Sequence, residues 1–101
     1  MNIIVKNEIK SSYAVSAEKG AIIYKLVIDK LKSNEKVIVD FKGISSTIST
    51  FFNSWYALLF KDYDEKFIND YVIFVNIEKK ITEHQIEAVK ENAIKFYKRG
   101  E

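Results

Sequence analysis

Two short, nearly continuous apolar runs, at residues 37–41 and 71–75, most constrain what this chain can fold into. Both consist largely of β-branched and aromatic residues, and Asp40 is the only charged residue in either. Runs of this length without polar alternation are typical of parallel strands that are buried on both faces of a sheet. A segment with helical periodicity precedes the first run, and an apolar segment expected to be helical lies between the two runs, which favours parallel strands joined by helical crossovers.

The remaining segments complete an alternating order of strands and helices. Residues 2–9 are rich in β-branched side chains and predict a first strand, and residues 13–15 are a candidate for a short strand beside it. Ser16 stands where an N-cap is expected, before a helix that the periodicity places at about residues 17–32. Residues 51–60 are apolar nearly all round, which predicts one largely buried helix.

The last helix has the clearest start signal of the chain. Thr82 and Gln85 have capping-box spacing, and Ile81 and Ile86 stand where a hydrophobic staple would place them. We therefore predict that Thr82 is the N-cap. The expected inward stripe of this helix is Ile86, Val89, Ala93, Phe96 and Tyr97.

This order predicts an α/β fold with a small parallel or mixed sheet. A chain of 101 residues has the length of one domain, which we place at residues 1–101. The residues expected in its core are Val37, Val39, Phe41, Leu58, Val72, Phe74 and Ile86.

Charge and composition exclude several classes of protein. Sixteen basic and fourteen acidic residues alternate along the chain, and fifteen of the sixteen are lysine, so a nucleic-acid partner is not expected. No apolar run approaches the ~20 residues of a membrane span, and the first ten residues lack the pattern of a signal peptide. The absence of cysteine favours a reducing, cytoplasmic setting.

No catalytic or cofactor-binding pattern emerges. His84 is the single histidine, which rules out a two-histidine zinc helix, and its place in the first turn of the last helix predicts a solvated side chain. Asp62, Asp64 and Glu65 resemble the start of a calcium loop, but Ile73 stands where the closing glutamate belongs. The three glycines lie too far apart to cradle a phosphate. We expect no enzymatic activity, no metal and no cofactor.

One polar region stands out at the end of the first apolar run. Asp40 ends that run, and the polar residues 45–50 lead into the next helix. In a parallel sheet such a loop opens at the carboxyl edge, where α/β domains place their functional groups. Ser49 or Thr50 is expected to cap the helix, at a positive dipole end that also stabilises phosphate. The alternative is that these residues only cap the helix and solvate its entrance.

The sequence V-I-V-D-F-K-G-I at residues 37–44, followed by S-T-F-F-N at residues 49–53, resembles the core of the STAS-like domains of unknown function. These are relatives of the STAS domains of anti-sigma-factor antagonists, and the resemblance extends over residues 2–98. It implies a small STAS-like domain, with a mostly parallel sheet of about four strands and three main helices. It also implies a non-enzymatic protein-interaction module.

The resemblance also implies a kind of partner and a switch. Anti-sigma-factor antagonists bind a histidine-kinase-like ATPase and respond to phosphorylation of a serine at the start of the second helix, in a D-S-S-G or D-S-T-G motif. Ser49 and Thr50 fall on the two hydroxyl positions and are the candidate phosphoacceptors. Ile48 replaces the aspartate and Phe51 replaces the glycine, so the chain departs from the motif on both sides of the hydroxyls.

These observations place the expected partner surface on the loop at residues 43–50 and the exposed side of residues 51–60. The candidate contact residues are Asp40, Ser45, Ser46, Thr47, Phe52, Trp55 and Tyr56. The three aromatics are anchors only if the core does not need them. Two other interpretations stay open: a small phage or mobile-element inhibitor or effector with the same fold, and a nucleotide-binding domain that uses the Asp40 loop.

Overall fold

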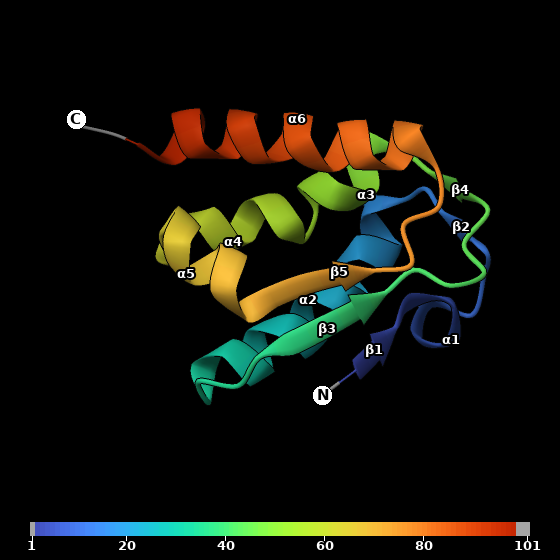
Figure 1. Cartoon of the computed structure of the whole chain (residues 1–101), viewed down its shortest axis with the longest axis horizontal. Coiled ribbons are helices and arrows are strands. Elements are labelled where there is room, and N and C mark those ends of the chain that lie inside the picture. The colour runs from blue at the N-terminus through green and yellow to red at the C-terminus, as the bar shows by residue number, and fades with distance from the viewer. Residues whose placement is uncertain (1, 99–101) are drawn as a thin grey trace.

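The computed structural model describes residues 2–98, and its centre is a three-stranded parallel sheet. Strand β3 (Val37–Asp40) lies between β1 (Asn2–Ile4) and β5 (Val72–Val75) (Figure 1). A separate parallel pair, β2 (Tyr13–Ala14) and β4 (Ser46–Thr47), lies beyond the carboxyl ends of these strands. The predicted α/β fold is confirmed, with its strands divided between a three-stranded sheet and a two-stranded ribbon.

The first segment is a strand only as far as Ile4. Helix α1 (Val5–Ile9) follows at once and ends at Lys10, whose φ is 56°. The prediction of one strand over residues 2–9 is therefore wrong. Val5 and Ile9 are four residues apart, so a helical turn puts both on one side, where they are buried and α1 packs against the next helix.

Helix α2 (Ala17–Lys32) confirms its sequence signals. The Ser16 hydroxyl accepts a hydrogen bond from the Lys19 amide at 3.2 Å, as expected of an N-cap. One face of α2 is buried, and Gly20 on that face lies against Ser54 in the following helical region. In Figure 1, α2 runs behind the three-stranded sheet.

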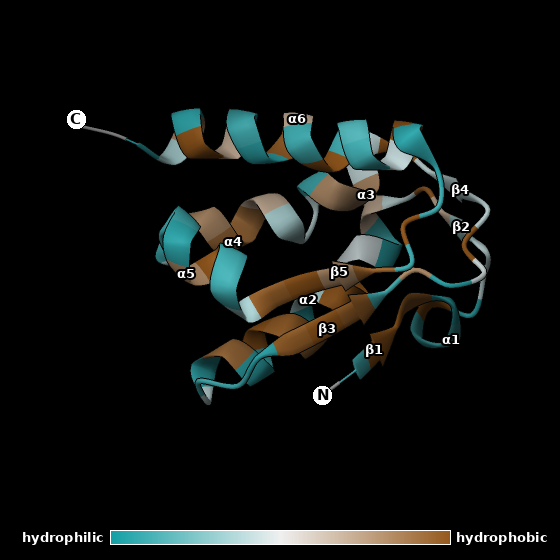
Figure 2. Ribbon diagram, viewed as in Figure 1, coloured by the Kyte–Doolittle hydropathy of each residue, from teal (hydrophilic) through white to brown (hydrophobic). Residues whose placement is uncertain are grey.

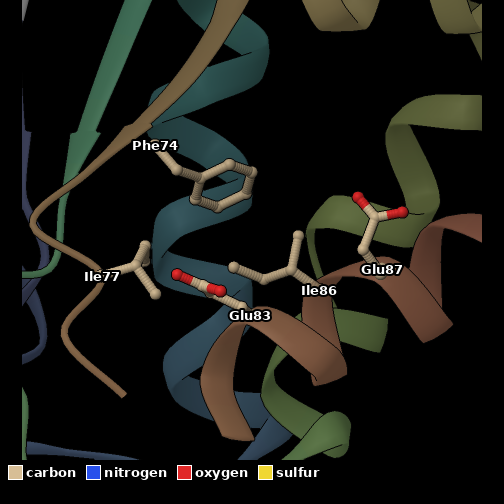
Figure 3. A pocket seen from close by; sticks show the side chains of 5 residues that line it. All are labelled: Phe74, Ile77, Glu83, Ile86 and Glu87. Carbon is tan, nitrogen blue, oxygen red and sulfur yellow. The ribbon is translucent and has the colours of Figure 1, made fainter. Parts of the chain in front are cut away.

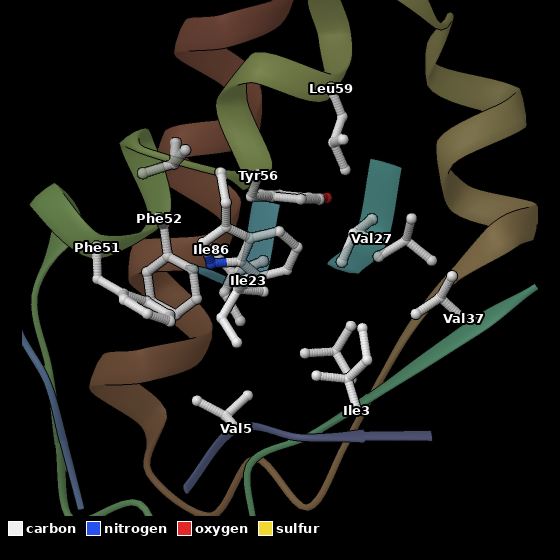
Figure 4. Close-up of a cluster of buried hydrophobic side chains, with 14 of the residues drawn as sticks. Ile3, Val5, Ile23, Val27, Val37, Phe51, Phe52, Tyr56, Leu59 and Ile86 are labelled. Atoms are coloured by element: carbon white, nitrogen blue, oxygen red, sulfur yellow. The ribbon is translucent and has the colours of Figure 1, made fainter. Parts of the chain in front are cut away.

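The apolar segment predicted as one helix is broken in two. Helix α3 (Ser49–Asn53) ends where the Ser54 hydroxyl donates to the Phe51 carbonyl at 2.7 Å, and α4 (Tyr56–Asp62) begins after Trp55. A single helix would bury one stripe and expose the rest. Because the axis changes direction at Ser54 and Trp55, aromatic side chains from both pieces reach the core (Figure 4).

Helix α5 (Glu65–Tyr71) begins at a side-chain cap and precedes β5 directly. The Asp64 carboxylate accepts a hydrogen bond from the Phe67 amide at 2.8 Å, so it serves as the N-cap of α5. Lys90 lies 3.6 Å from the Glu65 carboxylate. Two of the three acidic residues that resembled the start of a calcium loop, Asp64 and Glu65, therefore have structural partners.

The core lies between the sheet and its helices and agrees with most of the expected set. Five of the seven expected core residues are buried, whereas Leu58 and Phe74 are only half-buried. The five are Val37, Val39, Phe41, Val72 and Ile86.

Helix α6 (Lys80–Tyr97) packs along α3 and α4 and begins two residues before the predicted N-cap. Its N-cap is Lys79, without a side-chain hydrogen bond, so the capping-box prediction is wrong. Ile81 is 62% exposed, and the expected hydrophobic staple is not formed. Phe96 and Tyr97 were both expected on the inward stripe, but neighbouring residues on a helix point about 100° apart. Tyr97 faces inward, and Phe96 is 76% exposed.

None of the described helices is long and apolar enough to cross a membrane.

Candidate functional site

The helices of the described residues cover only one face of the three-stranded sheet. Figure 1 shows α2 behind the sheet and no described helix in front of β3, and Figure 2 shows that β3 and β5 are hydrophobic along most of their length. Alternate side chains of each strand point to opposite faces. The register places the uncovered ones in two rows, which we call the outer face: Asn2, Ile38 and Ile73, then Ile4, Asp40 and Val75.

The exposure of the outer face corrects the prediction that both apolar runs are buried on two sides. Ile4 and Ile73 are each 38% exposed, and Ile38 and Val75 are half-buried. On the inner face, Val37 and Val39 are completely buried. The outer face is therefore an apolar surface that the described part of the chain leaves accessible to solvent.

Asp40 lies at the carboxyl end of the outer face, as its sequence position predicted. One carboxylate oxygen accepts hydrogen bonds from the Asn76 side-chain amide at 2.8 Å and from the Lys42 backbone amide at 2.9 Å. The bond from Asn76, followed by that from Lys42, lowers the pKa of Asp40 below its ordinary value. Asn76 has a φ of 60°, a conformation that asparagine tolerates better than most residues. The pair joins the ends of β3 and β5.

We expect the pKa of Asp40 to rise when its amide partner is removed. Asn76→Gly removes the side-chain donor, and glycine accepts the positive φ without strain. In the wild-type protein, the stability from this lowered pKa is present above the unfolded-state value of about 3.9 and is lost as pH falls through the folded-state value. A carboxyl-detected NMR titration measures the Asp40 pKa in both proteins. Identical titration curves would contradict the assignment.

A hollow of about 290 Å³ adjoins Asp40 at this end of the outer face. Its lining includes the lysines Lys6 and Lys42 and ends at Gly43. Gly43 has a φ of 82°, and a Cβ there would lie 2.9 Å from the Lys6 side chain, so the turn favours glycine on both counts. The outer face thus has an apolar centre and a charged border at its carboxyl end.

The loop after Gly43 is held by the β2–β4 ribbon. The Ser45 amide donates to the Ser12 carbonyl at 2.8 Å, and Lys79 donates to the Ser45 carbonyl. Ser45 and Ser46 keep exposed side chains, as expected of contact residues. Thr47 is 8% exposed, so its assignment as a partner contact is wrong.

Thr47 is instead the centre of a hydrogen-bond network with α6. Its hydroxyl donates to the Gln85 side-chain oxygen at 2.7 Å, and the Gln85 amide donates back to the Thr47 carbonyl at 3.1 Å. The Thr82 hydroxyl lies 2.9 Å from that of Thr47 and is the donor there, because the Thr47 proton is already used. The spacing of Thr82 and Gln85 puts both on one helix face, which serves tertiary contact as well as it serves capping.

Removing members of this network should destabilise the protein by unequal amounts. Thr82→Val removes one donor, with an expected cost of about 0.5–1.5 kcal/mol. Thr47→Val leaves the Thr82 and Gln85 groups without their partner, with an expected cost of about 1–3 kcal/mol. Urea unfolding of both variants and of the double variant measures the costs. If the two costs simply add, the residues are not coupled and the network is refuted.

Ser49 and Thr50 are the first residues of α3, and both are exposed. The N-cap is Ile48, without a side-chain hydrogen bond, so the prediction that Ser49 or Thr50 caps the helix is wrong. Ile48 is 42% exposed. The start of α3 therefore presents an exposed apolar side chain, Ile48, followed by two accessible hydroxyls, Ser49 and Thr50.

The aromatic residues expected to anchor a partner lie inside the core. Phe52 and Trp55 have no exposed surface, and Tyr56 is 4% exposed, so the described structure makes none of them available as a surface anchor. Ile4, Ile38 and Ile73 lie on the outer face, although the apolar sequence runs predicted that such residues would be buried. The one sequence signal for an exposed face is the charge at Asp40. Because side chains alternate along a strand, Asp40 lies on the same face as Ile38 and on the opposite face from Val39.

A family model described as "STAS-like domain of unknown function (DUF4325)" matches residues 19–82. The match begins in α2 and ends in the first turn of α6, and it includes both the Asp40 turn and the start of α3. Neither a search of curated proteins nor one of solved structures found a significant match.

Proposed function

The chain belongs to the family of STAS-like domains of unknown function, and on that premise we propose that it is a non-enzymatic protein-interaction module of the cytoplasm. The observation that carries the proposal is the outer face of the sheet. Parallel sheets are normally covered on both faces, because their strands are apolar on both. Here Ile4 and Ile73 remain 38% exposed on the second face.

A protein partner is the occupant that suits this surface. Interfaces combine an apolar centre with a polar rim. Ile38 and Ile73 supply the centre, and Asp40 with Lys6 and Lys42 supplies a charged rim at one end. Burial of apolar area contributes roughly 25 cal/mol per Å², so covering the isoleucines would favour association.

The resemblance to anti-sigma-factor antagonists supports a kinase-like ATPase as the partner, with Ser49 or Thr50 as the switch. Both hydroxyls are accessible in the first turn of α3, the helix that follows the Asp40 loop and β4 along the chain. A phosphate there would add up to two negative charges at the start of α3, which the proposal includes in the partner's contact surface. The buried aromatics do not take part in this surface.

Affinity capture from the native host with matched baits tests the proposal. Ile73→Lys places a charge at the centre of the outer face. Ile22→Lys is the control, since Ile22 is 42% exposed on α2, away from that face. We expect the same partner to be retained by the wild type and by Ile22→Lys and lost by Ile73→Lys, with all three proteins folded in a thermal melt. Equal recovery by all three baits would refute the proposed surface, and a partner other than an ATPase would refute the kinase-like assignment.

A charge at Ser49 tests the switch. Ser49→Asp is expected to weaken binding of the captured partner without lowering the melting temperature, because negative charge at a helix start is tolerated by the helix dipole. Ser49→Ala is the control and should bind as the wild type does. Unchanged affinity of Ser49→Asp in a calorimetric titration would exclude Ser49 from the interface.

A further inference from the structure

A second unfilled surface lies at the edge of the sheet, between β5 and α6. It is a cleft of about 470 Å³ (Figure 3). Phe74, Ile77 and Ile86 supply its apolar lining, and the carboxylates of Glu83 and Glu87 stand beside them on α6. The cleft is distinct from the outer face and shares no lining residue with it.

No described lysine forms an ion pair with the carboxylates at this cleft. Glu83 and Glu87 are one helical turn apart and both exposed, an arrangement of like charges that is mildly unfavourable. Among residues 2–98, the ion pairs join Lys66 to Asp70 and Lys90 to Glu65, and neither involves this pair. Behind Phe74, burial raises the pKa of Tyr56 and the charge of Glu87 raises it further.

The wall opposite the glutamates is a strand edge without a neighbour. Among residues 2–98, β5 is a terminal strand of the sheet and pairs only with β3. The Val75 carbonyl accepts from the Phe41 amide at 3.0 Å on the β3 side. Because backbone groups alternate in direction along a strand, the amide and carbonyl of Phe74 point to the free edge. The amide can donate a hydrogen bond to an added strand, and the carbonyl can accept one from it.

We propose that this cleft binds an extended segment of a protein partner by an arginine side chain on that segment. The guanidinium lies between Glu83 and Glu87, the aliphatic stem lies on Phe74 and Ile86, and the segment's backbone pairs with the free edge of β5. The inference shares with the proposed function only the premise of a protein partner, and it uses a different surface.

Charge complementarity selects arginine among the side chains that could enter. An apolar side chain would strip water from two carboxylates and offer them no partner. A lysine ammonium is a point charge, whereas the planar guanidinium presents five donors and can reach both carboxylates at once. Arginine also stacks on aromatic faces, and the half-buried Phe74 ring offers one.

The test is an NMR titration of the isotope-labelled protein with a blocked peptide that has one central arginine between two valines. We expect saturable shifts at the Phe74 amide and in the first turns of α6, and affinity that falls as salt is added. Peptides with glutamate or norleucine at the centre should bind at least tenfold more weakly. A single arginine with both ends blocked should also bind more weakly than the peptide, since it has no extended backbone to pair with the free edge of β5.

Matched protein variants separate this site from general charge effects. The double variant Glu83→Gln/Glu87→Gln should lose at least tenfold in affinity. Glu78→Gln/Glu91→Gln removes the same charge from exposed residues outside the cleft and should bind as the wild type does. The inference is overturned if both double variants bind equally, if shifts map elsewhere, or if nothing saturates by roughly 5 mM peptide. Equal binding of the blocked single arginine and the peptide would overturn the strand-edge contact. Binding through the outer face would be unaffected by any of these results.

Discussion

Replacing Trp55 with alanine is expected to lower the free energy of unfolding by about 3–5 kcal/mol, the range for removal of a large buried aromatic. Trp55 has no exposed surface and lies at the break between α3 and α4. Its ring contacts those of Phe51, Phe52 and Tyr56 from the same segment and Phe74 from β5. The cavity would therefore open where both helices meet the sheet.

Two comparisons make this prediction specific. Phe96→Ala removes an aromatic that is 76% exposed and should cost less than about 1 kcal/mol. Trp55→Phe should cost less than Trp55→Ala, because it keeps a ring and removes an indole N–H that has no hydrogen-bond partner among residues 2–98. Chemical denaturation measures all three. Costs for Trp55→Ala and Phe96→Ala that agree within error would mean that Trp55 is not a core residue.

Gly20→Ala is expected to destabilise the protein strongly, although alanine is the better helix former by about 1 kcal/mol. A Cβ at Gly20 would lie 1.6 Å from the Ser54 hydroxyl oxygen and 2.6 Å from the Phe51 carbonyl oxygen. These atoms cannot overlap, so α2 must move away from α3. Forced overpacking costs about 1–3 kcal/mol and sometimes more, and we expect a net loss near the upper end of this range.

A double variant identifies the cause of that loss. Ser54→Gly removes the hydroxyl and the Cβ that the new methyl group would meet, so Gly20→Ala should cost less in the Ser54→Gly background than alone. Rescue should be partial, because the Phe51 carbonyl remains in place. Denaturant midpoints of the four proteins in this cycle give the coupling. A Gly20→Ala variant as stable as the wild type would contradict the close approach of α2 and α3.

The sequence predicted those elements whose signals are local. Ser16 and the periodicity of residues 17–32 predicted α2 to the residue, because a cap and one apolar stripe agree there. The apolar runs predicted β3 and β5 to within one residue at each end, because each run is short, continuous and rich in β-branched and aromatic residues. The prediction of one strand over residues 2–9 failed because their β-branched composition suits a strand, whereas residues 5–9 form α1 and pack against α2, β1 and β2.

Other elements depend on tertiary contacts that no local pattern states. The break at Ser54 follows from burying aromatics on more than one side of the segment, which periodicity alone does not reveal. Thr82 and Gln85 have capping-box spacing, but Thr47 lies opposite them and takes their hydrogen bonds. Their partner is 35 or more residues away along the chain, so sequence spacing could not predict it.

The candidate site was predicted in position but not in composition. Asp40 lies at the carboxyl edge as expected, and Ser45, Ser46, Ser49 and Thr50, which follow it along the chain, are exposed. The apolar part of the surface was assigned to the wrong element, because aromatic residues serve a core and an interface equally well. Recognition of the outer face needs the strand register and the side on which the helices pack, and a single sequence contains neither.

The central claim is that a protein partner covers the outer face of the sheet. Calorimetric titration of the captured partner with the wild type, Ile73→Lys and Ile22→Lys tests it most directly. We expect Ile73→Lys to raise the dissociation constant at least tenfold, about 1.4 kcal/mol, while Ile22→Lys stays within twofold of the wild type. A dissociation constant for Ile73→Lys that equals the wild-type value would contradict the claim.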